Sequence, residues 1–173
     1  MIEKIVNLGK LKINLDELQA FIVKAGENGY AGNGKYTRMP DGSKVCTFQK
    51  GNFHYTDDYA GSLQAPGNEI VRWQKEDGQR IWQRSYSGGM LFGFRDYEEL
   101  VKEAFIFLKK ALMNGDNVFR GPPKFENEDF VYRMTKKGDI NRFSGREWII
   151  DKKVYYNCTI FSQDFIGGLV IPK

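Results

Sequence analysis

The sequence predicts a single α+β domain over residues 1–173, in which a curved, mainly antiparallel sheet carries two α-helices packed on one face. A length of 173 residues suits one domain with its own core. Aromatic residues at 14% and 19 glycines are typical of many strands joined by tight turns. Two segments have helical periodicity and most of the rest alternates with a period of two, which favours the α+β class.

The first helix is expected from about residue 15 to residue 26. Its apolar positions at helical spacing are Leu15, Leu18, Ile22 and Ala25. Asn14 followed by Glu17 is an N-cap pattern. The glycine-dense residues 29–35, GYAGNGK, then predict a loop. Their spacing differs from that of a phosphate-binding loop, and they follow a helix instead of preceding one.

Residues 44–88 predict four antiparallel strands. The turn Gly51-Asn52 separates the first two, and Asp77-Gly78, flanked by alternating residues, is a strong hairpin signal. The second helix is expected within residues 96–115, with Asp96 and Glu99 as its capping pair.

The remainder of the chain predicts a loop and a meander. Consecutive prolines make residues 119–129 a rigid loop. Three or four strands follow, and residues 167–173, GGLVIPK, predict a short edge strand that could pair with a second copy of the chain.

Charge and composition exclude several classes of protein. The net charge of +4 comes from scattered residues, 26 basic against 22 acidic, so we do not expect nucleic acid as a partner. No apolar run is long enough to span a membrane and the N-terminus lacks a signal peptide, which predicts a cytoplasmic protein. Cys46 and Cys158 are predicted to be reduced thiols, both partly buried.

The segment NFHYTDDYAG, residues 52–61, holds the single histidine and two adjacent carboxylates. On a strand, Asp57 and Asp58 point to opposite faces, so they do not form a catalytic dyad. A lone His54 beside aromatic residues favours a packing role. One histidine and two distant cysteines predict no metal or other cofactor. A carboxylate site for Mg²⁺ or Ca²⁺ from Asp57, Asp58 and Glu69 is a weaker alternative.

Several motifs, taken in series, resemble a family of uncharacterised bacterial and archaeal domains. The motifs are GYAGNGK, FHYTDDYAGS, GNEIVRWQKEDGQRIWQRSYSGG, FRGPPKFENEDFVYRM and the terminal GGLV, and the likeness spans most of residues 15–170. Members of that family stand alone or follow an XRE-type helix-turn-helix. The resemblance implies a fold and no activity. Arg84 departs from the pattern, because the family has methionine there.

The same pattern arranges polar and aromatic residues in rows on neighbouring strands. If the strands pair as predicted, Asp57 and Glu69 face Arg84 or Arg120 on one sheet face. Such a face is typical of a small-molecule pocket. A buried ion pair beneath a loop is the alternative. The candidate ligand-binding residues are Tyr30, Asn33, Tyr55, Asp57, Tyr59, Glu69, Trp73, Trp82, Arg84, Tyr86 and Arg120.

These observations predict a non-enzymatic, sensor-like domain that binds a small molecule or a protein, and we assign no catalytic residue. An enzyme using Asp57, Glu69 and His54 as acids and bases is the alternative. A second alternative is a nucleic-acid-binding sheet whose aromatic residues stack against bases, although core packing is favoured; the candidates are Trp73, Trp82, Tyr86 and Tyr59.

Overall fold

The structure is a computed structural model that describes residues 4–32, 34–115, 118–153 and 157–173. Within these residues the chain forms a nine-stranded sheet, a two-stranded sheet and two α-helices, which confirms the predicted α+β class. The first half contains β1 (Ile5–Leu8), β2 (Leu11–Asn14), α1 (Leu15–Asn28), β3 (Thr37–Arg38), β4 (Lys44–Lys50), β5 (Phe53–Tyr59), β6 (Gly67–Trp73) and β7 (Arg80–Met90). The second half contains the 3₁₀ helix η1 (Phe92–Phe94), α2 (Glu98–Met113), β8 (Lys124–Glu126), β9 (Phe130–Asp139), β10 (Arg142–Asp151) and β11 (Cys158–Leu169).

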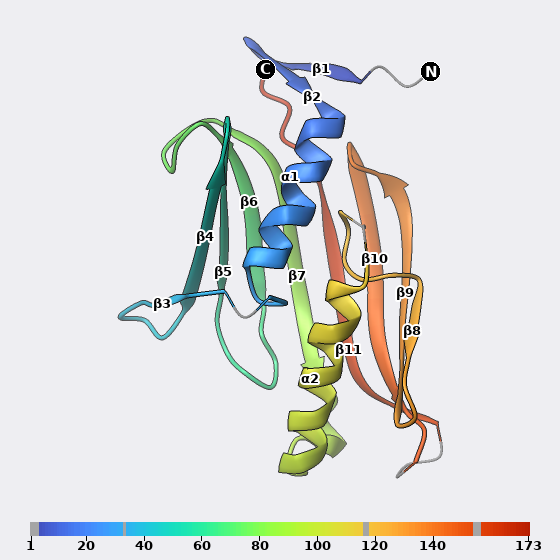
Figure 1. The fold of residues 1–173 in the computed structure, drawn as a ribbon. Helices are drawn as coiled ribbons and strands as arrows, with labels where there is room; N and C mark the ends of the chain where they lie inside the picture. The colour runs from blue at the N-terminus through green and yellow to red at the C-terminus, as the bar shows by residue number, and fades with distance from the viewer. Residues whose placement is uncertain (1–3, 33, 116–117, 154–156) are drawn as a thin grey trace.

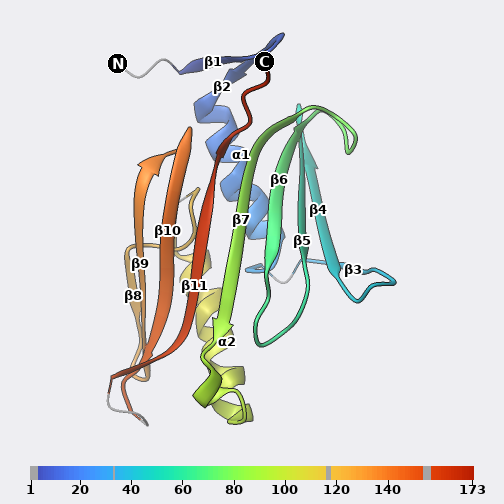
Figure 2. The same cartoon turned by 180° about the vertical axis from the view of Figure 1, so that it is seen from behind.

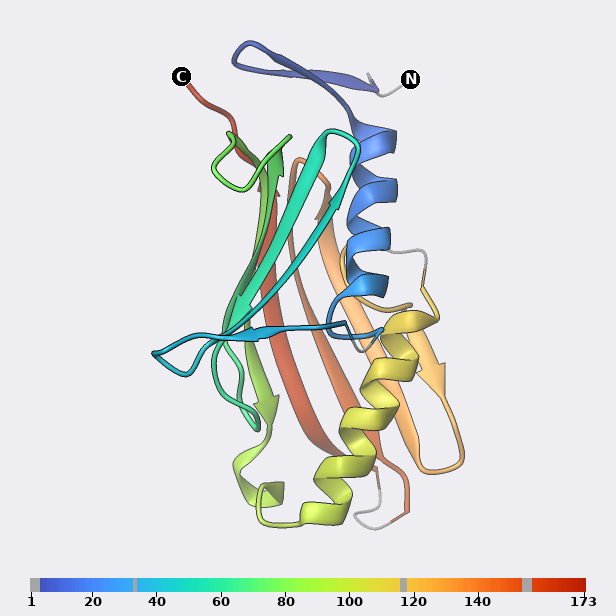
Figure 3. The same cartoon turned by 60° about the vertical axis from the view of Figure 1, so that its left-hand side comes forward.

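The large sheet consists of two antiparallel meanders joined at its centre. Its strand order is β3-β4-β5-β6-β7-β11-β10-β9-β8, so the last strand of each meander, β7 and β11, pair with each other. The sheet is curved, and both helices lie against the same face (Figures 1 and 3). The view from behind shows no helix on the opposite face (Figure 2).

The predicted helices are present, with one error in their capping. Asn14 caps α1 as expected, because its side-chain oxygen accepts hydrogen bonds from the backbone N–H groups of Asp16 and Glu17 at 2.9 and 3.2 Å. The predicted capping by Asp96 and Glu99 is wrong. Among the described residues Tyr97 is the N-cap of α2 and no side chain caps it.

The predicted C-terminal edge strand is also wrong. Gly167 and Gly168 belong to β11, which lies in the middle of the sheet between β7 and β10. Glycine is required here for close packing, since a Cβ atom at Gly167 would lie 2.3 Å from the backbone oxygen of Gln83 on β7. The self-pairing edge expected at residues 167–173 is therefore not formed by these glycines.

Some short strands were not predicted. The chain forms a hairpin of β1 and β2, and the predicted loop 119–129 contains β8.

The prediction for the two cysteines is confirmed only in part. Cys46 and Cys158 are both free thiols, but Cys46 is buried and Cys158 is exposed. No helix in the described part of the chain is both long and apolar enough to cross a membrane.

Each helix covers a different half of the sheet. On α1, Phe21 packs against Phe48 of β4 and Phe53 of β5, with ring centroids 5.7 and 5.1 Å apart. On α2, Phe107 packs against Phe125 of β8 and Phe130 of β9 at 5.5 and 5.3 Å. The face of the central strands beneath the two helices therefore borders both of them, and the candidate site lies there.

Candidate functional site: a cavity over a buried charged network

A line of charged residues crosses three neighbouring strands on the face that carries the helices. Asp57 of β5 pairs directly with Glu69 of β6, and Glu69 pairs with Arg84 of β7. All three are buried, with 4 to 6% of each residue exposed. Residues in register on adjacent antiparallel strands point to the same face, so the sheet holds two carboxyl groups and a guanidinium side by side.

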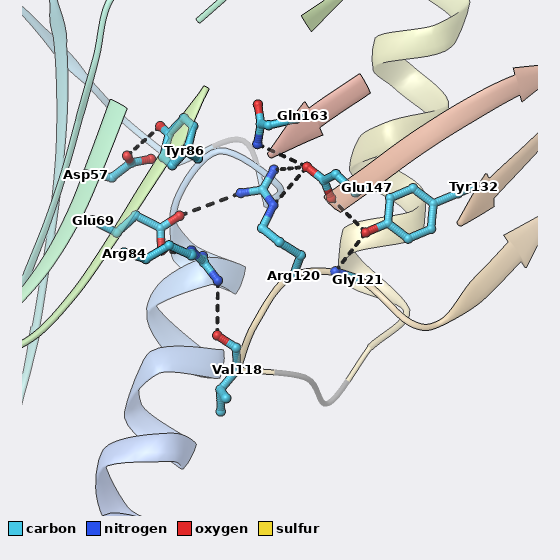
Figure 4. A network of polar contacts seen from close by, with 10 residues as sticks. All are labelled: Asp57, Glu69, Arg84, Tyr86, Val118, Arg120, Gly121, Tyr132, Glu147 and Gln163. Atoms are coloured by element: carbon cyan, nitrogen blue, oxygen red, sulfur yellow. Dashed lines mark hydrogen bonds and ion pairs between the residues drawn. The ribbon is translucent and has the colours of Figure 1, made fainter. Parts of the chain in front are cut away.

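The two arginines of this site are bound to carboxylates (Figure 4). Glu69 forms an ion pair with Arg84, whose guanidinium also donates to the carbonyl oxygen of Val118 at 3.0 Å. Arg120, from the segment after α2, lies 3.6 Å from the other Glu69 oxygen and 2.8 Å from Glu147 of β10. This segment therefore joins the two meanders across the face of the sheet.

Glu147 is the centre of the second half of the network. Besides Arg120 it accepts hydrogen bonds from the Tyr132 hydroxyl at 2.7 Å and the Gln163 amide at 3.1 Å. The Tyr132 oxygen in turn accepts the backbone N–H of Gly121 at 3.1 Å. These bonds compensate the cost of burying a carboxylate that is 0% exposed.

Above the network is a cavity of about 430 Å³. The sheet and the segment after α2 line it with polar side chains, among them Asp57, Glu69, Arg84, Tyr86, Arg120 and Gln163. The helices line it with apolar side chains, among them Ile22, Val23, Val101, Phe105, Leu108 and Leu112. A mostly apolar wall that faces a few fixed polar groups is the usual composition of a small-molecule site, and the volume lies within the usual range.

Asp57 differs from the other two carboxylates because it has no arginine as a hydrogen-bond partner among the described residues. Its Oδ1 accepts a hydrogen bond from the Tyr86 hydroxyl at 2.7 Å. Burial, followed by the proximity of Glu69, raises the pKa of Asp57 to about 7, and the Tyr86 hydrogen bond and both arginines reduce this shift only in part. Asp57 therefore exchanges a proton near neutral pH.

The tyrosines around the cavity remain protonated. Burial raises the pKa of Tyr86 and of Tyr55, and the negative charges of Asp57 and Glu69 raise both further. Burial likewise raises the pKa of Tyr30 to about 12. These phenols are therefore neutral hydrogen-bonding groups, whose aromatic rings also supply apolar surface.

Two lysines lie over tyrosine rings that line the cavity. The Lys109 ammonium is 4.8 Å from the centroid of the Tyr30 ring, and the Lys44 ammonium is 5.3 Å from that of Tyr59. The two rings meet edge to face with centroids 6.5 Å apart. Residues from the loop after α1, from α2, β4 and β5 thus meet at one side of the cavity.

The structure brings most of the predicted site residues together. Eight of them line the cavity: Tyr30, Tyr55, Asp57, Tyr59, Glu69, Arg84, Tyr86 and Arg120. Trp73 and Trp82 lie outside it, where Trp73 packs edge to face on Phe53 and Trp82 stacks on Phe143. Asn33 lies outside the described residues.

The structure separates His54 from the other two residues of the predicted acid-base enzyme. His54 and Asp57 are three residues apart on β5 and so point to opposite faces of the sheet, and His54 does not line the cavity. The same alternation separates Asp58 from Asp57 and Glu69, which divides the predicted carboxylate site for Mg²⁺ or Ca²⁺. No group of three metal-ligating side chains is found among the residues that the structure describes.

Sequence reasoning missed Glu147, Tyr132 and Gln163. A signal was present in the segment REWIID, where Glu147 occupies a core-facing position two residues before the buried Ile149. A charged residue at an inward position of an alternating strand indicates a buried partner of opposite charge. The first helix was expected to end at about residue 26, but Gly26 lies within α1 and lines the cavity.

A curved antiparallel sheet with a ligand-sized cavity beneath two helices defines the structural class of this protein. The chain belongs to the family DUF5680, a domain of unknown function, whose match covers residues 57–170. That span contains the charged network and α2, whereas α1 precedes it. Neither the curated proteins nor the solved structures contain a match to this chain.

Proposed function

We propose that this protein is a non-enzymatic, sensor-like domain that holds a small molecule in the cavity between the sheet and its two helices. One observation carries the proposal: a cavity of about 430 Å³ has a buried ionic network on one side and apolar helix surface on the other. Protein interiors are ordinarily close-packed, and buried ionisable groups cost free energy to desolvate. A fold that keeps both an open volume and charged groups beside it fits a ligand site better than a purely structural core.

The position of the helices supports a sensing role. Ile22 on α1 and Leu108 on α2 line the same cavity, so a bound molecule contacts both helices and the sheet. Binding would therefore stabilise one placement of the helices on the sheet.

The test is a thermal-shift screen of the purified protein against metabolites, nucleotides and divalent ions. A ligand that binds only the native state must raise the melting temperature. Asp57→Asn should abolish or change the response. Asp58→Asn, the next residue on the same strand but on the opposite face, should keep it.

A variant that fills the cavity tests the same site without changing a charged residue. A Cβ atom at Gly26 would meet no heavy atom within 4 Å, so Gly26→Phe can place its ring in the cavity without a backbone clash. The hits should disappear in Gly26→Phe while the fold is retained. Hits that survive this substitution, or a screen without hits, would contradict the proposal and favour a protein partner.

An acid-base enzyme is the second candidate, because Asp57 has a pKa of about 7 and lies in a cavity. The measurement is mass spectrometry of each hit after incubation with the protein. The binding role predicts that the ligand is recovered unchanged. Turnover that requires Asp57 and is lost in Asp57→Asn would favour the enzyme.

A further inference from the structure

We propose that the cavity binds an organic cation, an amine attached to an apolar body, with Asp57 as the counter-ion. This inference rests on the proposed function and adds the chemical class of the ligand. It combines the charges of the network, the tyrosines around Asp57 and the apolar helix wall.

The network contains one more carboxyl group than guanidinium groups. Glu69 is paired with Arg84 and Glu147 with Arg120, which leaves the Asp57 carboxyl as the third. Among the described residues Asp57 has one hydrogen-bond partner, the neutral Tyr86 hydroxyl. A carboxylate that is 4% exposed and lines a cavity without a cation of its own is complementary to a cationic ligand.

The arginines are poorly placed to bind an anion. Arg84 is committed to Glu69 and the Val118 carbonyl, and Arg120 lies between Glu69 and Glu147. An anion would have to displace one of these carboxylates, and it would meet Asp57 as a further negative group. Lys44 and Lys109 also line the cavity, but both are partly exposed, so solvent and salt weaken their attraction for an anion.

The tyrosines favour the same class of ligand. Tyr30, Tyr55, Tyr59 and Tyr86 all line the cavity. Three of their rings already accept a positive group of the chain itself: Lys109 lies over Tyr30, Lys44 over Tyr59, and the Arg120 guanidinium over Tyr86 at 5.6 Å. Aromatic rings around a carboxylate are the usual surroundings of a bound ammonium group.

The apolar side chains of the two helices indicate that the part of the ligand beyond the ammonium group is apolar. Leu108 and Phe105 on α2 and Ile22 on α1 face the cavity with hydrocarbon surface. An apolar body buried there gains free energy in proportion to the area removed from water. A hydrophobic amine satisfies both sides of the cavity, whereas a metal ion would leave the helix wall without a partner.

Binding of a cation is linked to the protonation of Asp57. The titratable and charged groups that face this carboxyl come from four neighbouring strands and the segment after α2. They are Glu69 on β6, Arg84 and Tyr86 on β7, Arg120 after α2, the Cys46 thiol on β4, and Tyr55 and Tyr59 on β5. With a pKa of about 7, roughly a tenth of Asp57 is ionised at pH 6 and nine tenths at pH 8. An ammonium ligand should therefore bind about tenfold more tightly at pH 8 than at pH 6. The amine itself stays charged over this range, as lysine does.

The experiment compares three probes that share a phenyl ring on a four-carbon chain and differ in the terminal group: 4-phenylbutylamine, 4-phenylbutanol and 4-phenylbutyrate. Their affinities are measured by calorimetry and ligand-observed NMR at pH 8 and at pH 6, with the wild-type chain, Asp57→Asn, Asp58→Asn and Gly26→Phe. The amine should bind the wild-type chain and Asp58→Asn most tightly, and more weakly at pH 6. Asp57→Asn should weaken amine binding at least tenfold and leave the weak binding of the alcohol unchanged. Gly26→Phe should abolish both.

The outcomes separate this inference from the proposed function. If the alcohol or the butyrate binds in a manner blocked by Gly26→Phe while the amine does not, the cavity is a ligand site and the cation class is wrong. If the amine binds equally well to Asp57→Asn, or with the same affinity at pH 6 and pH 8, Asp57 is not its counter-ion and the inference fails. If the amine fails to bind at millimolar concentration, the inference fails, and the broader screen still decides the proposed function.

Discussion

Asp57 and Glu69 are directly paired across β5 and β6, so two buried carboxyl groups lie side by side on the face that carries the helices. Paired like charges are unfavourable unless one group is neutralised. The ion pair with Arg84 neutralises Glu69, and proton uptake neutralises Asp57. This division of roles gives the site its charge and its dependence on pH.

Replacing Asp57 should change how stability depends on pH. Well below pH 3.8, the ordinary pKa of this carboxyl, Asp57 is protonated in both the folded and the unfolded chain. Between about pH 4 and 7 the unfolded chain loses this proton while the folded chain keeps it. The stability that Asp57 contributes is therefore fully present at low pH and is lost as the pH rises through about 7, by on the order of 1.4 kcal/mol per pH unit.

Asp57→Asn mimics the protonated carboxyl at every pH. Relative to the wild type, it should become progressively more stable from pH 5 to pH 7, and the difference should level off above that. Urea denaturation of both proteins at pH 5, 6, 7 and 8 measures it. Asp58→Asn is the matched control. A constant difference between Asp57→Asn and wild type across this range would disprove the raised pKa.

Glu69→Gln should destabilise the fold strongly. The substitution removes the ion-pair partner of Arg84 and the nearby charge that Arg120 faces, at side chains only 5% and 8% exposed for Glu69 and Arg84. Breaking a buried pair from one side costs about 3 to 5 kcal/mol, because the remaining charge is left without compensation. Urea denaturation at pH 7 measures the loss.

An exposed ion pair provides the control for the loss of stability expected in Glu69→Gln. Arg146 and Asp164 form an ion pair at 2.7 Å with more than half of each side chain exposed, so Asp164→Asn should change stability little. Equal effects of Glu69→Gln and Asp164→Asn would mean that the network is not required for stability.

The part of the site on β5, β6 and β7 could be predicted from the sequence because consecutive hairpins connect these strands. Alternation fixes which residues of each strand share a face, and the connections at residues 60–66 and 74–79 are short enough to limit the register in which Asp57, Glu69 and Arg84 can pair. Asp57 and Glu69 are twelve positions apart, and Glu69 and Arg84 are fifteen positions apart. Patterns within this short stretch of sequence were therefore sufficient to predict that the three residues lie together.

The part contributed by the second meander could not be predicted in the same way. Its position depends on the pairing of β7 with β11, and no local signal identifies β11 as a central strand. Gly167 was predicted to lie in a short edge strand, although it is the close approach of β7 that requires glycine there. The contact between Arg120 and Glu147 follows from this long-range pairing and was therefore missed.

Tyr132→Phe tests whether the hydrogen bonds around Glu147 matter for stability. The Tyr132 hydroxyl is buried, donates to Glu147 and accepts the N–H of Gly121. Its removal leaves a buried N–H without this partner and should cost about 1 to 3 kcal/mol in urea denaturation. Tyr36→Phe, at a residue that is 48% exposed, should have little effect. Similar stability of the two variants would show that the hydroxyl is dispensable.

Gly26→Ala should stabilise the protein. Gly26 lies within α1, where glycine is less favourable than alanine by about 0.5 to 1 kcal/mol because of its greater backbone freedom in the unfolded chain. The added methyl group meets no heavy atom within 4 Å, so no clash offsets the gain. Thermal unfolding should therefore show a higher melting temperature. Gly29→Ala, at the C-cap just beyond the helix, has a Cβ position 3.3 Å from the carbonyl oxygen of Ala25 and should show no such gain. Destabilisation by Gly26→Ala would mean that the space beside α1 is filled, contrary to the cavity on which the proposed function depends.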